Sequence, residues 1–201
     1  MYHKLSSSLL SSQIVVFLCV HGVINIDAKA LGNLPPVLGW NTWCTQNKCG
    51  NDWCTEDEII SVGTAMKENG LLDAGYSYLN LDDCWGVRNE KTKRIEADPS
   101  RFPNGIKYLV SKIPNLGFKI GIYTDMGENG CHHPFTGSWP YYKQDANDFS
   151  EWGVDYVKFD YCDKPEGYLS SQLTENMSHA LENTKTNNSI WLNFHCNWLT
   201  F

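Results

Sequence analysis

Short apolar segments typical of β-strands alternate with amphipathic, helix-like segments along most of this 201-residue chain. The strand-like segments are VLGW (37–40), YSYLNLDD (76–83), KIGIYTD (119–125), VDYVKFD (154–160) and SIWLNFHC (189–196). Helical patterns lie between them, over roughly 55–72, 104–114, 140–152 and 169–184, and the first opens with Thr55 and Glu58 at capping-box spacing. The alternation predicts right-handed β–α–β crossovers and a parallel sheet, as in doubly wound sheets and (β/α)8 barrels.

Polar side chains end every predicted strand. They are Trp40, Asn41 and Trp43 after the first, then Asp82 with Asp83, Tyr123 with Asp125, Lys158 with Asp160, and His195 with Asn197. In (β/α)8 barrels, functional sites are built at the carboxyl ends of several strands at once. No Gly-x-Gly-x-x-Gly or P-loop motif follows a strand, which counts against a nucleotide-binding sheet. The pattern therefore favours the barrel.

The segment VDYVKFD places a lysine and an aspartate in an otherwise apolar strand. Because side chains alternate along a strand, Lys158 and Asp160 share one face, while Val157 and Phe159 share the other. A cation beside a carboxylate favours its ionised form, which a covalent nucleophile at a sugar anomeric carbon requires. The alternative interpretation is a buried Lys–Asp pair that only fixes the register of the strand.

Asp82 and Asp83 allow two interpretations. Two carboxylates at a strand end can accept hydrogen bonds from adjacent sugar hydroxyls, and the flat ring of Trp43 could form a stacking wall beside them. A metal site that also uses His132 and His133 is less favoured, because adjacent strand residues face opposite ways and no His-x-x-His spacing occurs. We therefore expect no metal and no cofactor. A Gly-x-Ser-x-Gly elbow of serine hydrolases is also absent.

The first 30 residues have the order of a secretory signal peptide. Lys4 precedes an apolar stretch over 14–20, and Ala28-Lys29-Ala30 matches a cleavage site, so a mature chain is expected to begin near Leu31. The apolar stretch is too short to span a bilayer as a mature helix. We expect a secreted protein, or one delivered through the secretory pathway to a lysosome or vacuole.

Cysteine content fits an oxidising compartment. Seven cysteines follow the leader, namely Cys44, Cys49, Cys54, Cys84, Cys131, Cys162 and Cys196, and their spacing does not match a structural zinc site. Asn176 and Asn187 begin glycosylation sequons, which suit the same route. The net charge of −7, without a basic stripe, argues against a nucleic-acid partner.

Several of these segments resemble the secreted α-galactosidases of the melibiase family, glycoside hydrolase family 27. The matching motifs are LGWNTW (38–43), YLNLDDCW (78–85), RFPNGIK (101–107), GIYTDMG (121–127), WGVDYVKFDYC (152–162) and HCNW (195–198). They cover nearly all of the chain after the leader, in order. The resemblance implies a retaining glycosidase with a catalytic (β/α)8 TIM barrel, of which residues 31–201 would supply about the first five β/α units.

The resemblance also implies roles for individual residues. Asp160 corresponds to the catalytic nucleophile, and Asp82, Asp83 and Lys158 correspond to groups that bind galactose hydroxyls. Tyr123 corresponds to a pocket tyrosine, and Trp43 to an aromatic wall. Asn197 stands where many members carry a glutamate, and it can still bind a hydroxyl.

The same resemblance implies the disulfides Cys44–Cys84, Cys49–Cys54 and Cys131–Cys162. It pairs Cys196 with a cysteine further along than Phe201, and it places the general acid/base aspartate and a small β-sandwich domain there as well. We therefore expect this chain to be a C-terminally truncated form, inactive by itself, and we expect that a full-length form could be a homodimer.

Three functions follow from these residues. The first is an exo-α-galactosidase that releases terminal α-D-galactose from oligosaccharides or glycoconjugates through attack by Asp160. The second is an α-N-acetylgalactosaminidase of the same family, and the third is a non-catalytic, truncated galactose-binding form. The segment beyond HCNW, which senses the 2-substituent of the sugar in this family, would discriminate between the first two.

Overall fold

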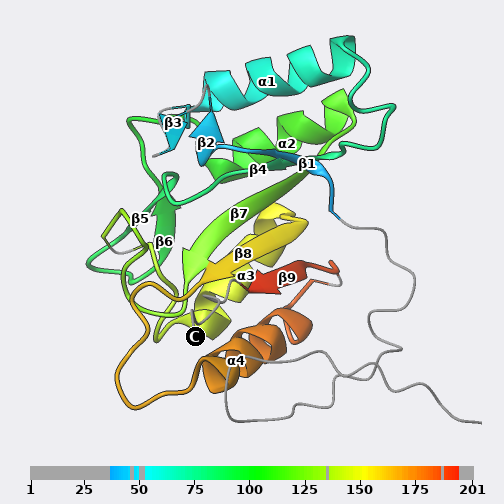
Figure 1. The fold of residues 1–201 in the computed structure, drawn as a ribbon. Helices are drawn as coiled ribbons and strands as arrows, with labels where there is room; N and C mark the ends of the chain where they lie inside the picture. Colours follow the sequence, from blue (N-terminus) through cyan, green and yellow to red (C-terminus); the bar gives the residue numbers. More distant parts are fainter. Residues whose placement is uncertain (1–36, 46–47, 50–52, 135, 187, 195–201) are drawn as a thin grey trace, which may run out of the picture. The chain divides into compact units, whose positions relative to one another are not determined.

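The computed structural model describes residues 37–45, 48–49, 53–134, 136–186 and 188–194 (Figure 1). Its main feature is a five-stranded sheet in the order β1-β4-β7-β8-β9, in which every neighbouring pair of strands is parallel. The strands are β1 (Gly39–Asn41), β4 (Tyr78–Asn80), β7 (Lys119–Asp125), β8 (Tyr156–Asp160) and β9 (Trp191–Phe194). Four of the five predicted strand segments contain one of these strands and the first overlaps β1, so the parallel sheet is confirmed.

Four helices connect these strands: α1 (Glu56–Glu68), α2 (Ile106–Leu116), α3 (Tyr142–Trp152) and α4 (Ser170–Glu182). Figure 1 shows α1 and α2 beside the end of the sheet formed by β1 and β4, and α4 beside β9. As predicted, Thr55 caps α1: its side chain accepts the N–H of Glu58 at 3.4 Å and donates to the Glu58 carboxylate at 2.7 Å. Helix α2 ends at Gly117, which adopts the left-handed conformation with φ of 100°.

The sheet register determines which side chains meet at its carboxyl end. Tyr123 pairs with Lys158, and two residues later Asp125 pairs with Asp160. Register partners in a parallel sheet project to the same face, so the last residues of β7 and β8 bring two pairs of polar side chains together.

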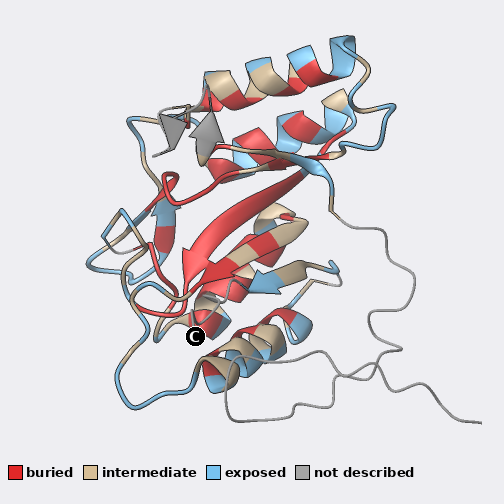
Figure 2. Ribbon diagram, viewed as in Figure 1, coloured by how far each residue is buried: buried red, intermediate tan, exposed pale blue. Residues whose placement is uncertain are grey.

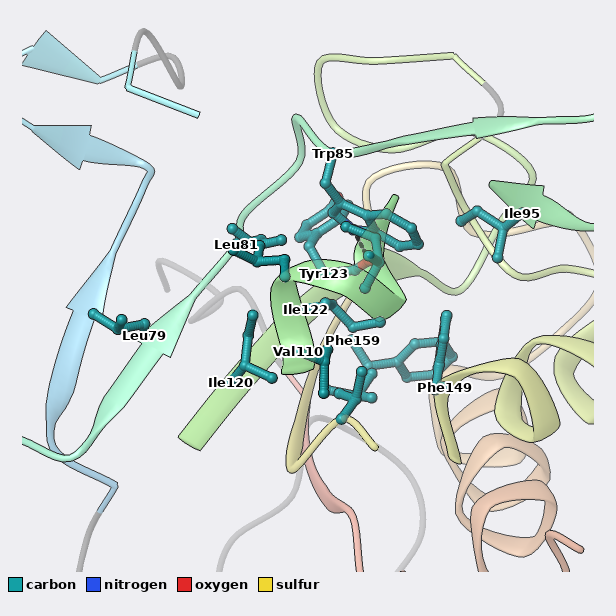
Figure 3. Packing of buried hydrophobic residues seen from close by; sticks show 14 of the residues in the cluster. Leu79, Leu81, Trp85, Ile95, Val110, Ile120, Ile122, Tyr123, Phe149 and Phe159 are labelled. Carbon is teal, nitrogen blue, oxygen red and sulfur yellow. Dashed lines mark hydrogen bonds between the residues drawn. The ribbon is translucent and has the colours of Figure 1, made fainter. Parts of the chain in front are cut away.

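The opposite face of the sheet packs against the helices. Val157 and Phe159 are completely buried, and the Phe159 ring meets Tyr142 of α3 edge to face at 5.8 Å between centroids. Buried residues run along β7 in Figure 2, and Figure 3 shows Phe159, Phe149 and Ile122 among the clustered apolar side chains. Each such side chain contributes roughly 1.5–3 kcal/mol through burial.

Two small antiparallel hairpins were not predicted from the sequence. One pairs β2 (Cys44–Thr45) with β3 (Lys48–Cys49), and the other pairs β5 (Gly86–Arg88) with β6 (Ile95–Ala97). The second hairpin is held to α3 by ion pairs, since Arg88 binds Asp145 at 2.6 Å and Arg94 binds Asp148, and it also buries Ile95 in the apolar core. Because its sequence lacks an alternating apolar pattern, periodicity could not reveal it.

The disulfides differ in part from the predicted pairing. Cys131 bonds to Cys162 as expected. However, Cys84 bonds to Cys54 rather than to Cys44, so neither Cys44–Cys84 nor Cys49–Cys54 forms in this structure. Cys54 lies two residues before α1, and its Cα is 6.3 Å from the Cα of Cys84, a normal separation for a disulfide.

The predicted leader, residues 1–30, lies outside the described residues. Among the helices that the structure does describe, none combines the length and the apolar character needed to cross a lipid bilayer.

Candidate functional site

An open pocket of about 450 Å³ lies at the carboxyl ends of the strands. β1 and the segment after it supply Gly39, Trp40, Asn41 and Trp43 to its lining. Asp82, just after β4, and Lys158 of β8 complete the lining. The sequence predicted functional residues at strand ends, and three of those proposed for substrate binding, Trp43, Asp82 and Lys158, line this pocket. Its volume lies in the range typical of small-molecule sites.

Lys158 joins the two acidic residues of the pocket region. Its Nζ lies 2.8 Å from the Asp82 carboxylate and 3.6 Å from the Asp160 carboxylate. The Lys158 side chain keeps 24% of its exposure, whereas the two carboxylates keep 3% and 8%. An ammonium in this position offsets the cost of burying two negative charges and leaves donor capacity toward the pocket.

Asp160 is the last residue of β8, and the local backbone fixes its position. Its carbonyl accepts the N–H of Met126 at 2.8 Å, and its own carboxylate accepts the N–H of Tyr161 at 3.1 Å. The predicted alternation holds here, because Lys158 and Asp160 face each other while Val157 and Phe159 are buried among the helices. The arrangement gives a carboxylate that is nearly buried, paired with a cation and adjacent to an open pocket.

Asp83 turns away from this pocket. Its carboxylate accepts the N–H groups of His132 at 2.6 Å and His133 at 3.2 Å, and the hydroxyl of Thr136 at 2.8 Å. The side chain is 1% exposed and holds the segment that follows β7. The sequence predicted sugar contacts for both adjacent aspartates; in this structure Asp82 faces the pocket and Asp83 supports a loop.

Tyr123 is completely buried beneath Lys158. The Lys158 Nζ lies 5.2 Å above the centre of its ring, and its hydroxyl accepts the N–H of Cys131 at 3.0 Å. Burial, with the nearby carboxylates of Asp83 and Asp125 adding to it, raises the pKa of Tyr123 well above its ordinary value, so the phenol stays neutral. The structure therefore places Tyr123 as a support for Lys158 and for the Cys131–Cys162 bridge.

Trp43 lies at the mouth of the pocket, with its N–H bonded to the Asn41 side chain at 2.8 Å. The ring of His132 stacks on it at 4.6 Å between centroids and a 38° tilt. Because Asp83 holds the backbone of His132, the loop after β7 brings this imidazole onto the aromatic wall. From the sequence, His132 was interpreted only as a possible metal ligand, and no sequence pattern indicated that it stacks on Trp43.

Thr42 is a further residue that the sequence did not single out. It is completely buried, and its hydroxyl accepts the N–H of Asp82 at 2.8 Å, which fixes the backbone of the pocket aspartate.

Asp125 is fully buried beside Asp160 and accepts three backbone N–H groups, from Gly127, Cys162 and Asp163. Burial raises the pKa of Asp125 to about 6; the negative charge of Asp160 adds to this rise, while the three donors oppose it.

One group of potential metal donors occurs among the described residues. Donor atoms of Asp125, Cys131, Asp160 and Cys162 lie within 4.8 Å of one another. The two sulfur atoms form the Cys131–Cys162 disulfide, so they offer no thiolate, and the Asp125 carboxylate is already bound by three N–H groups. This donor set does not fit a metal centre.

Four other predicted positions lie away from the pocket or outside the described residues. Asn176 is exposed on α4, where a glycan could be attached. Asn187 and Asn197 fall outside the described residues, as does Cys196.

Comparison with known protein families gives one match. The melibiase family model described as alpha galactosidase A matches residues 35–201. Among curated proteins, the alpha-galactosidase of Schizosaccharomyces pombe is 40% identical over 206 aligned residues, which cover 96% of this chain and 44% of the relative. A Dictyostelium discoideum relative is 44% identical over 133 residues, and only 32% of its length is matched. The chain thus spans less than half the length of these relatives.

Solved structures give the same result. Alpha-galactosidase I of Mortierella vinacea superposes with a TM-score of 0.70 at 36% identity, covering 81% of this chain and 40% of that structure. The alpha-galactosidase of Saccharomyces cerevisiae also gives 0.70, at 30% identity and with 35% of its chain covered. The five parallel strands and their helices are therefore the partial (β/α)8 barrel that the sequence predicted.

Proposed function

Because the chain belongs to the melibiase family described as alpha galactosidase A, we propose that the whole protein is a retaining α-galactosidase. Its substrates would be oligosaccharides or glycoconjugates that end in α-linked D-galactose. The observation that carries the proposal is the Lys158 ammonium, which lies 2.8 Å from Asp82 and 3.6 Å from Asp160 at the edge of an open pocket. This geometry supplies a carboxylate paired with a cation next to hydroxyl-binding groups, as glycosyl transfer to a protein side chain requires.

In the proposed reaction, a carboxylate oxygen of Asp160 attacks the anomeric carbon of galactose. The bond from that carbon to the glycosidic oxygen breaks, and the leaving oxygen takes a proton from a general acid. Water then attacks the same carbon, gives its proton to the conjugate base and releases galactose, which regenerates the Asp160 carboxylate. The anomeric configuration is retained because two displacements occur.

We assign the general acid to a residue outside the described part of the chain. At the strand ends that the structure describes, Asp82 is paired with Lys158, and Asp83 and Asp125 are each bound by several donors of the protein itself. A general acid must reach the leaving oxygen with its proton, and these buried, bound carboxylates are poorly suited to that task.

Asp82 and Lys158 would bind galactose hydroxyls, and Trp43 would contact the apolar face of the ring. These roles suit the residues, because a carboxylate accepts from two hydroxyls while an ammonium donates up to three hydrogen bonds. Asp83 and Tyr123 are proposed to act one layer behind, holding the loop after β7 and supporting Lys158. Asn197 stays a predicted hydroxyl contact.

The test uses the whole protein with two aryl glycosides, an α-galactoside and an α-N-acetylgalactosaminide. We expect release from the first, and an Asp160→Asn variant should lose at least about 10⁴-fold in kcat, as expected when the residue that forms the covalent bond is removed. Asp73→Asn, at an exposed position between α1 and β4, is the matched control and should keep full activity.

Preference for the N-acetylated substrate would favour the α-N-acetylgalactosaminidase alternative. Galactose binding without turnover of either glycoside would favour a binding protein.

We also propose that residues 1–30 direct the chain into the secretory pathway and are removed near Ala30, and that Asn176 carries a glycan. Sequencing the amino terminus of material from the culture medium should give Leu31 or a neighbouring residue. Recovery of a cytosolic product that begins at Met1 would contradict this proposal.

A further inference from the structure

The segments that follow β7 and β8 are held together by two aspartates that bind in opposite directions. Asp125, at the end of β7, reaches the segment after β8. Its Oδ2 accepts the N–H of Cys162 at 2.8 Å, and its Oδ1 accepts the N–H of Asp163 at 3.2 Å. The same Oδ1 accepts the N–H of Gly127 at 2.8 Å, so one carboxylate bonds to both segments.

Asp163 binds in the reverse direction. Its Oδ2 alone accepts three donors from the segment after β7: the backbone N–H of Glu128 at 3.1 Å, the backbone N–H of Asn129 at 2.8 Å and the Asn129 side-chain amide at 3.0 Å. Each aspartate therefore satisfies backbone donors of the other's segment. We refer to Asp125 and Asp163 as the aspartate clasp.

Two further contacts join the same segments. The Cys131–Cys162 disulfide links them covalently. In addition, the backbones approach so closely that a Cβ on Gly127 would overlap the carbonyl oxygen of Asp163, which explains why residue 127 has no side chain.

Asp160 lies between the bonds of this clasp. Its carbonyl is bound by the N–H of Met126, and the peptides of Cys162 and Asp163, two and three residues later, are bound by Asp125. Carboxylate oxygens of Asp125 and Asp160 lie within 4.8 Å of each other. A shift of the segment after β8 would therefore move Asp160 directly.

We propose that Asp125 and Asp163 are positioning residues that hold the carboxylate of Asp160 in line for attack on the anomeric carbon. The inference rests on the proposed function of Asp160 as the nucleophile. Neither aspartate contacts the substrate in this account. Both act through the backbone on each side of the reacting residue, so their loss should lower kcat more than it changes the binding of galactose.

The two aspartates offer matched variants, because their oxygens are used differently. Since one oxygen of Asp163 accepts all three bonds, Asp163→Asn can keep them through its amide oxygen, whereas Asp163→Ala loses them. Asp125 uses both oxygens, and Asn has only one. In Asp125→Asn the NH₂ group must therefore face the N–H of Cys162, or else the N–H groups of Gly127 and Asp163. Asp163 is only half-buried, so its replacement should leave the protein folded.

The experiment measures kcat and KM for an aryl α-galactoside, together with the dissociation constant of galactose, in the whole protein. Asp163→Ala and Asp125→Asn should lower kcat roughly 10- to 100-fold, the effect of a small displacement of a reacting group. Galactose affinity should stay within about threefold, and Asp163→Asn should keep kcat within about threefold of the unmodified protein. Unchanged kcat in Asp163→Ala, or equal losses in Asp163→Ala and Asp163→Asn, would overturn the proposal.

Failure of the proposed function would look different: the unmodified protein and Asp160→Asn would then be equally inactive. Backbone amide hydrogen exchange still tests the clasp in that case. Exchange at Glu128 and Asn129 should accelerate in Asp163→Ala but not in Asp163→Asn, and exchange either at Cys162 or at Gly127 and Asp163 should accelerate in Asp125→Asn. If all of these amides exchange as in the unmodified protein, the clasp does not hold these segments and the inference is wrong.

Discussion

Lys158 is the cation that two carboxylates of the site share. It lies close to two nearly buried carboxylates and above the Tyr123 ring, while part of its side chain still reaches the pocket. Removing the ammonium would leave Asp82 and Asp160 facing each other without a cation, and it would also remove a donor for the sugar. This one side chain therefore balances the charges of the site, and we propose that it also binds the substrate.

We expect Lys158→Met to weaken galactose binding by roughly 10- to 100-fold, since hydrogen bonds to charged groups are worth about 1.5–3 kcal/mol. Isothermal titration calorimetry of the whole protein with galactose measures this. Lys164→Met is the control, because Lys164 is exposed and donates to the carbonyl of Tyr168, outside the pocket. Equal affinities in the two variants would show that Lys158 does not bind the sugar.

Strand periodicity was sufficient to predict that Lys158 and Asp160 face the same way, because side chains on a strand alternate with a fixed period. It was not sufficient for Asp83 or His132. Their roles depend on how the segment after β7 folds back onto the strand ends, and loop conformations carry no periodic signal. The same reason explains why Asp163 was not recognised as a partner of Asp125.

At the level of elements, the start of helix α1 could be predicted from a local sequence motif. The Thr55–Glu58 spacing predicted its start, and in the structure the Thr55 hydroxyl accepts the N–H of Glu58 and donates to the Glu58 carboxylate. Bonds of this kind involve only neighbouring residues, so the sequence determines them before any tertiary contact forms.

We expect Thr55→Ala to lower the free energy of unfolding by about 1 kcal/mol, because the N–H of Glu58 loses its acceptor. Urea denaturation measures the change. Ser61→Ala, at an exposed position within α1, is the control and should be neutral or slightly stabilising, since alanine is the better helix former. A neutral Thr55→Ala variant would show that this cap does not stabilise the helix.

The disulfides are the opposite case, because their pairing depends on long-range geometry. Cys54 and Cys84 are 30 residues apart in sequence and meet only when α1 packs beside the end of β4. The family resemblance gave the wrong partner for Cys84, while Cys131–Cys162, whose residues follow two adjacent strands, was predicted correctly.

Peptide mapping without reduction should recover Cys54 linked to Cys84. Replacing both with serine should lower the free energy of unfolding by roughly 3–4 kcal/mol, the usual effect of opening a loop of this length. Recovery of a peptide in which Cys44 is linked to Cys84 would contradict the pairing in this structure.

At the scale of the molecule, burial raises the pKa of three carboxyl groups among the described residues: Asp125, to about 6, and also Asp145 and Asp155. In the unfolded chain such groups titrate near pH 3.9. A raised folded-state pKa means that the folded protein binds these protons more tightly. The contribution of these groups to the free energy of unfolding is fully present below about pH 4, and it is lost as the pH rises through their pKa values in the folded protein.

These groups therefore predict a higher urea midpoint at pH 5 than at pH 8. In Asp125→Asn, which cannot titrate at this position, the difference between the two midpoints should shrink. A midpoint that rises from pH 5 to pH 8 would show that other groups dominate the pH dependence of the fold.

The proposed mechanism depends most on Asp160, the residue assigned to bond covalently to the sugar. The direct measurement uses the whole protein and an activated, fluorinated α-galactosyl fluoride, whose glycosyl–enzyme intermediate hydrolyses slowly enough to be isolated. Peptide mass spectrometry then locates the sugar. We predict one galactosyl group per protein, on the peptide that contains VDYVKFDYC and at Asp160 within it. A sugar bonded to any other residue, or turnover of the reagent with no covalent adduct at all, would contradict the account.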